Sequence, residues 1–346
     1  KTLIHRLKNK WNITDAEDRV MCFDIQKENE LFNGWEDDSV SPSRELLPNG
    51  KESRYKTGPY GKGLGLDHFV KKAGGIDIII GGPPCQAYSV AGRVRDENGM
   101  RDDYRNYLFE HYLNVVNRYK PLVFIFENVP GMLSAMPDGT PITDLIEKGF
   151  ESIGYEIIND LKKYAKIDAS EYGVPQNRER LIIMGIRKDA YSNPQALLKD
   201  FYVNILPSYK VERKMTVEEA IGDLPALYPI INENSSPRRI GYTKAGCDVS
   251  WHRARHHSLR DVEIYGMLAE DIASGRNEYI DSKSLSNLYE ERVGAKSPIH
   301  RYHVLRKDEP STTIISHLDR DGNRFIHYDP KQCRDITPRE AARIQS

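Results

Sequence analysis

The chain has 346 residues, of which 29% are charged and 9% are aromatic, and its formal net charge is −1 at pH 7. These values are typical of a globular protein with one large domain or two. No apolar run approaches the roughly 20 residues of a membrane-spanning helix, so we expect no membrane partner. Because net charge averages over all faces, it neither predicts nor excludes a nucleic-acid partner.

The cysteines lie far apart in the chain and form no Cys-x-x-Cys pair: Cys22, Cys85, Cys247 and Cys333. This spacing argues against a disulfide framework or a zinc ribbon and suits a reducing compartment, so we expect a cytoplasmic protein. Three histidines follow one of the cysteines, but the spacing fits no standard zinc site. We therefore expect no metal at Cys247, His252, His256 and His257.

The chain opens with a predicted helical segment, TLIHRLKNKW, and a mixed segment that reaches residue 35. Residues 36–65 are rich in Gly, Pro, Ser and charge, which predicts a long loop or insertion. A solvated loop is the simpler interpretation of its basic residues, and a loop that contacts DNA is the alternative.

Strand and helix patterns alternate through the middle of the chain. Strands separated by helices of about 10–15 residues are typical of a largely parallel sheet with crossover helices. The fold class is therefore α/β, with a doubly wound, mostly parallel sheet. We expect strands at 76–82, 122–129, 155–164 and 180–186, and helices near 106–119 and 142–153.

The loop Gly81–Gln86, with the sequence GGPPCQ, follows the first of these strands. Its glycines permit a sharp turn, and its prolines stiffen the segment that carries Cys85. An open α/β sheet places its chemistry outside the carboxyl ends of its strands. These features favour a nucleophilic Cys85, and a cysteine that is merely buried is the alternative.

Three further segments have simple structural interpretations when each is taken alone. They are FENVPG at 126–131, QNRERLIIMG at 176–185 and RDITPREAARIQS at 334–346. Together with GGPPCQ they occur in the order found in the cytosine-5 DNA methyltransferases, and the chain closely resembles that family over residues 70–190 and 215–346. The resemblance implies the class I methyltransferase fold, S-adenosylmethionine as methyl donor and double-stranded DNA as substrate.

The resemblance implies covalent catalysis by Cys85, which adds to ring carbon 6 of a flipped cytosine and so activates carbon 5 for methylation. A cysteine suits this step because its thiolate is accessible near neutral pH and strongly nucleophilic. Glu127 then contacts ring nitrogen 3, and Arg180, with Arg178, binds the exocyclic oxygen. The base that removes the proton from carbon 5 is not identified.

The same resemblance implies binding residues for the donor and for DNA. The residues expected to border the donor are Pro83, Pro84, Asn106 and Leu108, with Asp24 and Asp67 as weaker candidates for an acidic contact. The residues expected to contact DNA are Gln86, Ser89, Arg93, Arg95, Gln176, Arg253 and Arg255.

The expected domains are a catalytic domain at 1–200, a smaller, irregular target-recognition domain at 201–305, and a return segment at 306–346 that packs on the catalytic domain. The family's Phe-x-Gly-x-Gly-Gly donor loop has no match before residue 76, and its closing Gly-Asn-x-Val segment has none after the final helix. We expect either a trimmed piece of a complete enzyme or one part of a split enzyme that is inactive alone.

The expected setting is a bacterial restriction or defence system, with a protein that acts as a monomer on nucleoid DNA. Cognate restriction or defence proteins are the expected partners. RNA is an alternative substrate, since one branch of the family modifies transfer RNA, although the long recognition segment argues against it.

Overall fold

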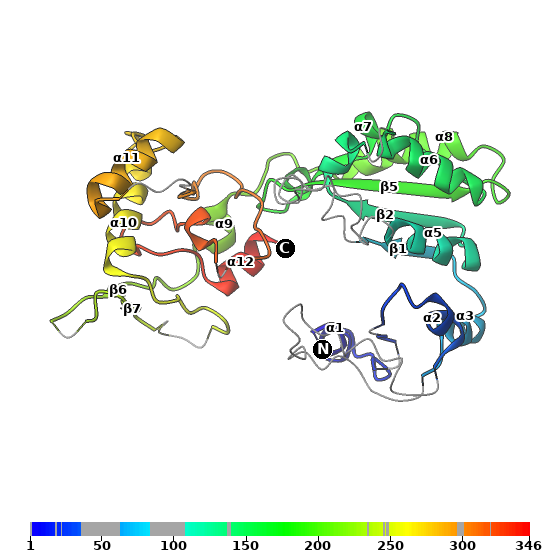
Figure 1. Cartoon of the computed structure of the whole chain (residues 1–346), viewed down its shortest axis with the longest axis horizontal. Helices are drawn as coiled ribbons and strands as arrows, with labels where there is room; N and C mark the ends of the chain where they lie inside the picture. The colour runs from blue at the N-terminus through cyan, green and yellow to red at the C-terminus, as the bar shows by residue number, and fades with distance from the viewer. Residues whose placement is uncertain are drawn as a thin grey trace. The chain divides into compact units, whose positions relative to one another are not determined.

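The structure is a computed structural model, and it describes residues 2–17, 19–21, 23–35, 63–83, 108–136, 140–233, 235–244, 246, 249–295, 301–318 and 320–346. The chain divides into two compact units (Figure 1). Unit 1 consists of Lys1–Lys166 and Leu181–Val203, and unit 2 consists of Ile167–Arg180 and Asn204–Ser346.

The described part of the chain contains a five-stranded sheet with the order β1-β2-β5-β3, and β4 pairs with β5. Its neighbours β1 and β2 are parallel, whereas β5 runs antiparallel to both β2 and β3. Three strands therefore share one direction, and β5 is the reversed strand among them (Figure 1). The strands are β1 (Ile78–Gly81), β2 (Val123–Asn128), β3 (Tyr155–Ile157), β4 (Lys166–Asp168) and β5 (Glu179–Arg187).

These bounds confirm the strands expected at 76–82, 122–129 and 180–186. The strand expected at 155–164 ends at Ile157, because the chain turns at Asp160, which has a positive φ of 61° and caps the next helix. The helices of unit 1 are α1 (Thr2–Trp11), α2 (Glu28–Asn33), α3 (Leu66–Ala73), α5 (Leu108–Tyr119), α6 (Ile142–Ser152), α7 (Leu161–Tyr164) and α8 (Pro194–Asp200).

An aromatic core forms where α5 and α6 cover one face of the sheet. Phe124 and Phe126 of β2 are fully buried, and the ring of Phe150 in α6 stacks on Phe124 at a centroid distance of 4.0 Å. Tyr112 of α5 contacts both β2 rings edge-on. Gly185 of β5 lies against Phe124, where any side chain would collide with the ring. Leu108, Tyr112 and Val116 form the buried apolar face of α5, which confirms the helix expected near 106–119.

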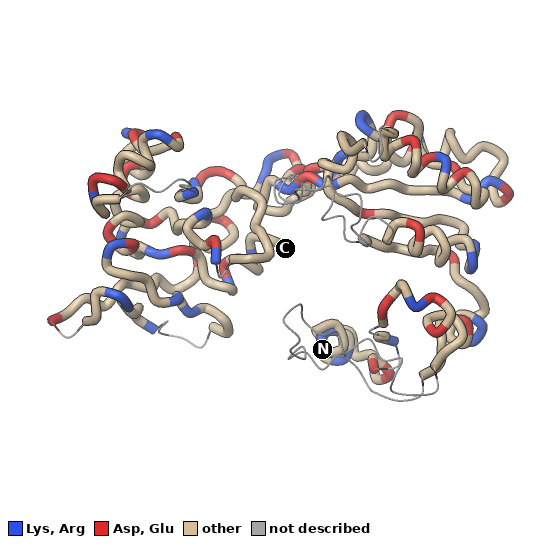
Figure 2. The backbone as a smooth tube through the Cα atoms, viewed as in Figure 1, with Lys and Arg blue, Asp and Glu red and all other residues tan. Residues whose placement is uncertain are grey.

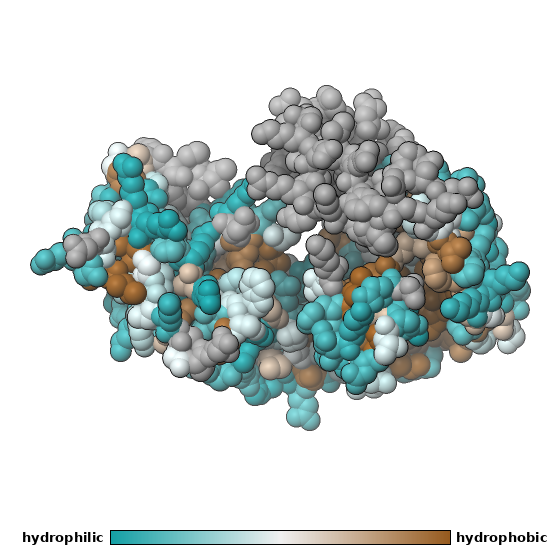
Figure 3. Space-filling view, turned by 90° about the horizontal axis from the view of Figure 1, so that it is seen from below, coloured by the Kyte–Doolittle hydropathy of each residue, from teal (hydrophilic) through white to brown (hydrophobic). Residues whose placement is uncertain are grey.

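The opposite face of β1 is apolar and exposed among the described residues. Ile78 and Ile80, which alternate with the inward-facing positions, are 55% and 72% exposed. Hydrophobic residues, coloured brown, are also visible at the surface of the described part of the chain in Figure 3. No helix in the described segments is long and apolar enough to cross a membrane.

Unit 2 contains two hydrophobic clusters. One joins α9 and α12 around Val217, Ile221 and Ile344, and the other joins α10 and α11 around Leu268 and Leu285. The regular elements of this unit are α9 (Val217–Ile221), β6 (Pro229–Ile230), β7 (Gly241–Tyr242), α10 (Leu259–Ala273), α11 (Ser282–Val293) and α12 (Pro338–Ile344).

The sequence predicted an irregular domain at 201–305, and α10 and α11 were not expected there. The apolar positions of α11 are sparse, since only Leu285 and Leu288 are buried, whereas α10 has buried apolar residues at helical spacing that the prediction missed. Lys, Arg, Asp and Glu positions are interspersed along both units (Figure 2). Residues 306–346 cluster with unit 2, so their expected packing on the catalytic domain stays a prediction.

Candidate functional site

The carboxyl ends of β1 and β2 bring two of the four sequence motifs together in unit 1. Gly81 is the register partner of Phe126 in this parallel pair. The chain therefore continues into Gly82 and Pro83 beside Glu127 and Asn128, at the edge where α/β sheets place their active sites.

Gly82 lies directly against the carboxylate of Glu127. A Cβ atom built on Gly82 would lie 2.8 Å from Oε2 of Glu127, closer than real Cβ contacts allow. The absence of a side chain therefore lets the carboxylate approach the loop backbone. Glu127 itself is half-buried, so its carboxylate remains accessible at this edge.

Asn128 ties the two strand ends together. Its side chain is 4% exposed, and its Nδ2 donates a hydrogen bond of 3.3 Å to the carbonyl oxygen of Pro83. Its Oδ1 accepts a hydrogen bond of 2.8 Å from the backbone N–H of Val129. The sequence reasoning gave Asn128 no role, although the residue stands inside the Glu-Asn-Val motif.

Most of the catalytic loop lies outside the described residues. Pro83 is the last described residue before it, and Leu108 is the first described residue after it. The expectations for Pro84, Cys85, Gln86, Ser89, Arg93, Arg95 and Asn106 therefore stay predictions, because all seven residues fall outside the described part of the chain.

The described candidates for donor binding differ in how they are placed. Pro83 is half-buried at the active-site edge, whereas Leu108 is 8% exposed and begins α5 on its buried face. Asp67 is engaged elsewhere: it pairs with Arg118 and accepts a hydrogen bond of 2.8 Å from the hydroxyl of Tyr119. The side chain of Arg118 holds the pKa of this carboxyl below its usual range. Asp24 is the other acidic candidate. Its Oδ1 accepts a hydrogen bond of 3.0 Å from the backbone N–H of Gln26 and so caps a local turn.

The third motif places Gln176 in the interior of unit 2. The side chain is fully buried; its Nε2 donates to the carbonyl oxygen of Ile344 at 3.3 Å, and its Oε1 accepts from the N–H of Ile314 at 3.1 Å. This position gives Gln176 a structural role. Its expected DNA contact stays a prediction, and in this structure the side chain exposes no surface for it.

The neighbouring arginines are half-buried. Nη1 of Arg178 donates to Oε1 of Gln176 at 3.4 Å, and its backbone N–H donates to Oδ1 of Asp168 at 3.0 Å. Burial opposes ionisation of Asp168, but hydrogen bonds from Ser170 and other donors hold the pKa of this carboxyl below its usual range. The guanidinium of Arg180 donates to the carbonyl oxygen of Glu179 at 2.7 Å. Their expected contacts with a cytosine stay predictions.

The two arginines expected to contact DNA from the recognition segment are placed differently. Arg255 forms an ion pair with buried Asp335, with 2.7 Å between Nε and Oδ2. Asp335 also accepts from Nε2 of His257 at 2.9 Å. Arg253 is exposed and has no ion pair with any residue that the structure describes. DNA contact therefore has more geometric support at Arg253 than at Arg255.

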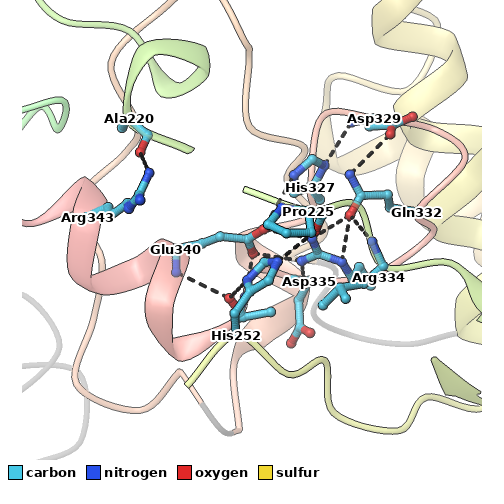
Figure 4. A network of polar contacts seen from close by, with 12 residues as sticks. Ala220, Pro225, His252, His327, Asp329, Gln332, Arg334, Asp335, Glu340 and Arg343 are labelled. Carbon is cyan, nitrogen blue, oxygen red and sulfur yellow. Dashed lines mark hydrogen bonds and ion pairs between the residues drawn. The ribbon is translucent and has the colours of Figure 1, made fainter. Parts of the chain in front are cut away.

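The fourth motif forms a buried polar network in unit 2 (Figure 4). Arg334 has no exposed surface, and its Nη1 and Nη2 donate bidentate hydrogen bonds of 2.7 Å to the carboxylate of Glu340. Gln332 accepts from Nε of Arg334 at 3.1 Å. Burial opposes ionisation of Glu340, but the hydrogen bonds and charge of Arg334 lower the pKa of its carboxyl.

Two histidines complete this network. Nε2 of His252 donates to the carbonyl oxygen of Pro225 at 2.7 Å, and Nδ1 lies 3.1 Å from Oγ1 of Thr337. Burial and the charge of Arg334 lower the pKa of His327 to about 4. Within the described residues no group of His, Cys, Asp and Glu is arranged to hold a metal, and Cys247 lies outside them.

The chain belongs to the C-5 cytosine-specific DNA methylase family, whose model matches residues 65–346. It is 34% identical over 292 residues to the Type II methyltransferase M.Bpa9945I of Bacillus paralicheniformis, covering 79% of this chain and 63% of that protein. It is 40% identical over 284 residues to the Type II methyltransferase M.XorII of Xanthomonas oryzae pv. oryzae, covering 78% of this chain and 60% of that protein. The chain thus spans about three fifths of the length of these relatives.

A solved structure gives a similar match. A putative DNA modification methyltransferase encoded within an Escherichia coli prophage is 26% identical to the chain, with a TM-score of 0.43, covering 81% of this chain and 71% of that one. The family match confirms the resemblance inferred from the four motifs and assigns the class I methyltransferase fold to the α/β sheet of unit 1.

Proposed function

We propose that the intact protein is an S-adenosylmethionine-dependent DNA (cytosine-5-)-methyltransferase. The observation that carries this proposal is the meeting of the Gly-Gly-Pro and Glu-Asn-Val motifs at the carboxyl ends of β1 and β2, in a chain that belongs to the C-5 cytosine-specific DNA methylase family.

The proposed reaction begins when the thiolate of Cys85 adds to ring carbon 6 of a cytosine that has been flipped out of the duplex. The electron pair of the 5,6 double bond then becomes available at carbon 5, which takes the methyl group. Loss of the proton from carbon 5 and departure of the thiolate restore the ring and the free enzyme. Addition replaces the 5,6 π bond by the bond between sulfur and carbon 6, and methyl transfer would break the bond between the methyl group and the sulfonium sulfur, leaving S-adenosylhomocysteine. The last step breaks the C5–H and C6–S bonds and restores the double bond, so no oxidant or reductant is needed.

Glu127 is the proposed partner of ring nitrogen 3. Its half-buried side chain lies at the edge of the sheet, beside Gly82. Gly82 belongs to the loop segment that leads to Cys85. A carboxyl group held there would stabilise the negative charge that spreads over the ring during addition. Arg178 and Arg180 are proposed to bind the exocyclic oxygen, for which guanidinium donors are well suited.

The methyl donor, S-adenosylmethionine, supplies an electrophilic methyl group when bound. Pro83 fits a role beside it, because its carbonyl oxygen is held by Asn128 and its ring is half-buried at the active-site edge. The buried position of Leu108 gives weaker support, since little of its side chain is accessible to a ligand. Pro84 and Asn106 complete the proposed set.

The proposed partner is double-stranded DNA in a bacterial restriction-modification or defence system, at the nucleoid. The relatives are named Type II methyltransferases, which supports this setting. Base-resolution methylation sequencing of unmethylated DNA incubated with the intact protein tests the proposal and reveals the recognition sequence. A parallel incubation with transfer RNA tests the alternative substrate, and methylation of RNA alone would overturn the proposal.

Two substitutions test the proposed roles. We expect Cys85→Ala to abolish methylation and covalent trapping on 5-fluorocytosine DNA while DNA binding persists.

We expect Glu127→Gln to slow single-turnover methyl transfer by about 100-fold or more, because the contact with nitrogen 3 matters mainly in the transition state. An unchanged transfer rate in Glu127→Gln would remove Glu127 from this role, and methylation by Cys85→Ala would refute the covalent mechanism.

A further inference from the structure

Two large aromatic side chains of unit 2, Tyr209 and Trp251, are mostly exposed to solvent, and Trp251 is the more exposed of the two. Trp251 is 76% exposed, in the basic segment SWHRARHHSLR at 250–260. A tryptophan buries more apolar area than almost any other residue when it is covered, so an indole left in solvent is an unusual arrangement. This exposure indicates a side chain that acts on a partner rather than in the core.

The backbone of Trp251 is held in a conformation that disfavours a bulky residue. Its φ is +65°, in the left-handed region that L-residues other than glycine rarely adopt. Such a residue persists only where its surroundings fix it, and strained residues of this kind concentrate at functional positions. A glycine would adopt this φ without strain. The presence of a tryptophan at this position therefore indicates that the side chain has a function of its own.

Contacts from α12 and its N-terminal segment fix both neighbours of Trp251. The backbone N–H of Arg339 donates to the carbonyl oxygen of Trp251 at 3.2 Å, and its Nε donates to the carbonyl oxygen of Ser250 at 2.8 Å. On the other side, His252 is 1% exposed and is held by Pro225 and Thr337 (Figure 4). The indole is therefore presented from a rigid backbone, which lowers the entropy lost when it binds.

Trp251 has exposed arginines in its own segment and in the hairpin that is bridged to it. Of the three arginines at 250–260, Arg255 is paired with Asp335 and Arg260 with Asp261. Arg253, two residues beyond the indole, is exposed and forms no ion pair within the described part of the chain. The segment is also bridged to the β7 hairpin, where Ile240 and His257 exchange backbone hydrogen bonds of 2.7 and 3.3 Å, and Arg238 and Arg239 of that hairpin are exposed.

An exposed aromatic ring beside free guanidinium groups is the combination that binds nucleic acid, with the ring stacking on a base and the cations contacting phosphates. Tryptophan and arginine also occur together in protein interfaces, but the exposed arginines of this segment and of the bridged hairpin, Arg253, Arg238 and Arg239, favour a polyanion as the partner. We propose that Trp251 stacks on an unstacked base of the DNA substrate, with Arg253 on the adjacent phosphates. This inference rests on the proposed function, because it takes DNA as the partner.

The test compares variants of the intact protein on a fluorescein-labelled DNA duplex of random sequence and on unmethylated genomic DNA. We expect Trp251→Ala to weaken duplex binding about 10-fold or more, as for loss of one stacked base, and Trp251→Phe to stay within about 3-fold of the wild type. Trp251→Gly should bind DNA as weakly as Trp251→Ala yet melt at a higher temperature than Trp251→Ala, because glycine relieves the positive φ. Arg253→Ala should reduce the salt dependence of binding.

Trp11 provides a matched control, since it is 62% exposed at the end of α1 in the other unit. We expect Trp11→Ala to bind DNA as the wild type does. A Trp251→Ala variant that folds and binds DNA with wild-type affinity would overturn the inference. The inference would also fall if Trp251→Ala reduced self-association of the protein while its DNA binding stayed unchanged, because Trp251 would then contact a second copy of the chain. A wild-type protein that binds DNA through Trp251 but methylates no cytosine would refute the proposed function and leave the stacking role in place.

Discussion

At the scale of single residues, the candidate site depends on how closely two strand ends approach. The carboxylate of Glu127 occupies the space that a side chain at position 82 would fill, and Asn128 holds the carbonyl oxygen of Pro83. The glycine at position 82 leaves room for the Glu127 carboxylate, and the buried amide of Asn128 holds the loop beside it. Small changes here should affect chemistry more than folding.

Gly82→Ala tests this view of the site. The new Cβ would lie 2.8 Å from Oε2 of Glu127, and the end of a flexible side chain can move away. We expect unfolding free energy to change by less than about 1 kcal/mol, because the carboxylate yields before the fold does. Methyl transfer should fall by about 100-fold, the effect of a displacement near 1 Å at a reacting group.

The control for this prediction is Gly246→Ala, because a Cβ at Gly246 would meet no described atom within 4 Å. We expect that variant to keep both stability and activity. Equal losses of stability and activity in Gly82→Ala would show that the glycine serves the fold alone.

At the scale of elements, the final helix α12 anchors unit 2. Its N-cap, Thr337, accepts from the N–H of Glu340 at 3.2 Å, and the Glu340 carboxylate accepts in return from the N–H of Thr337 at 2.7 Å. The same Glu340 carboxylate binds Arg334, so the motif that begins this helix is a capping box joined to a buried ion pair. The helix and its N-cap also contact three other segments of the unit, which contain Gln176, Asp223 and His252.

Substitution of Thr337 by alanine measures what this junction contributes. We expect Thr337→Ala to lower the free energy of unfolding by about 2 kcal/mol, from loss of the cap and of the contact with buried His252. Thr216 offers a matched comparison, because it closes a similar capping box on α9 without a histidine partner. Thr216→Ala should cost about 1 kcal/mol in urea unfolding. Equal costs for the two variants would mean that the His252 contact adds nothing.

At the scale of the whole molecule, unit 2 buries a charged network whose stability depends on pH. His327 has a pKa of about 4 because burial and the charge of Arg334 disfavour its protonation, and Asp329, Glu340 and His252 also face it. The unfolded chain would protonate this ring near pH 6.5. Between these two values the unfolded state binds a proton that the folded state does not.

Unit 2 should therefore lose stability as the pH falls from about 6.5 to about 4, by up to about 3 kcal/mol from this histidine. The contribution is fully present above pH 6.5 and is lost below pH 4. Urea unfolding followed by circular dichroism at pH values between 4 and 7 measures this loss. His327→Gln should flatten the pH dependence in this window, and an unchanged slope would show that other groups cause it.

The sequence predicted the elements whose signals are local. The apolar runs of β1, β2 and β5 and the apolar stripe of α5 needed no knowledge of distant residues, and the structure confirms them. Helix α11 escaped prediction because it buries only Leu285 and Leu288 within a polar sequence, whereas α10 buries Val262, Tyr265 and Leu268 at helical spacing, a local signal that the prediction overlooked. Packing against one another stabilises them, and this contribution does not appear in either segment alone.

The four ordered motifs by themselves determined the family, and with it the proposed reaction and donor. The sequence could not decide which of the polar motif residues face solvent. Gln176 and Arg334 resemble binding residues in composition, yet both are fully buried by partners brought from elsewhere in the chain. Gln176 bonds to Ile344, which is 168 residues away, and a buried polar group is stable only when such partners are in place. The tertiary structure therefore decided which motif residues hold the fold and which, such as Glu127, remain accessible, and it exposed Trp251, which lies outside the four motifs.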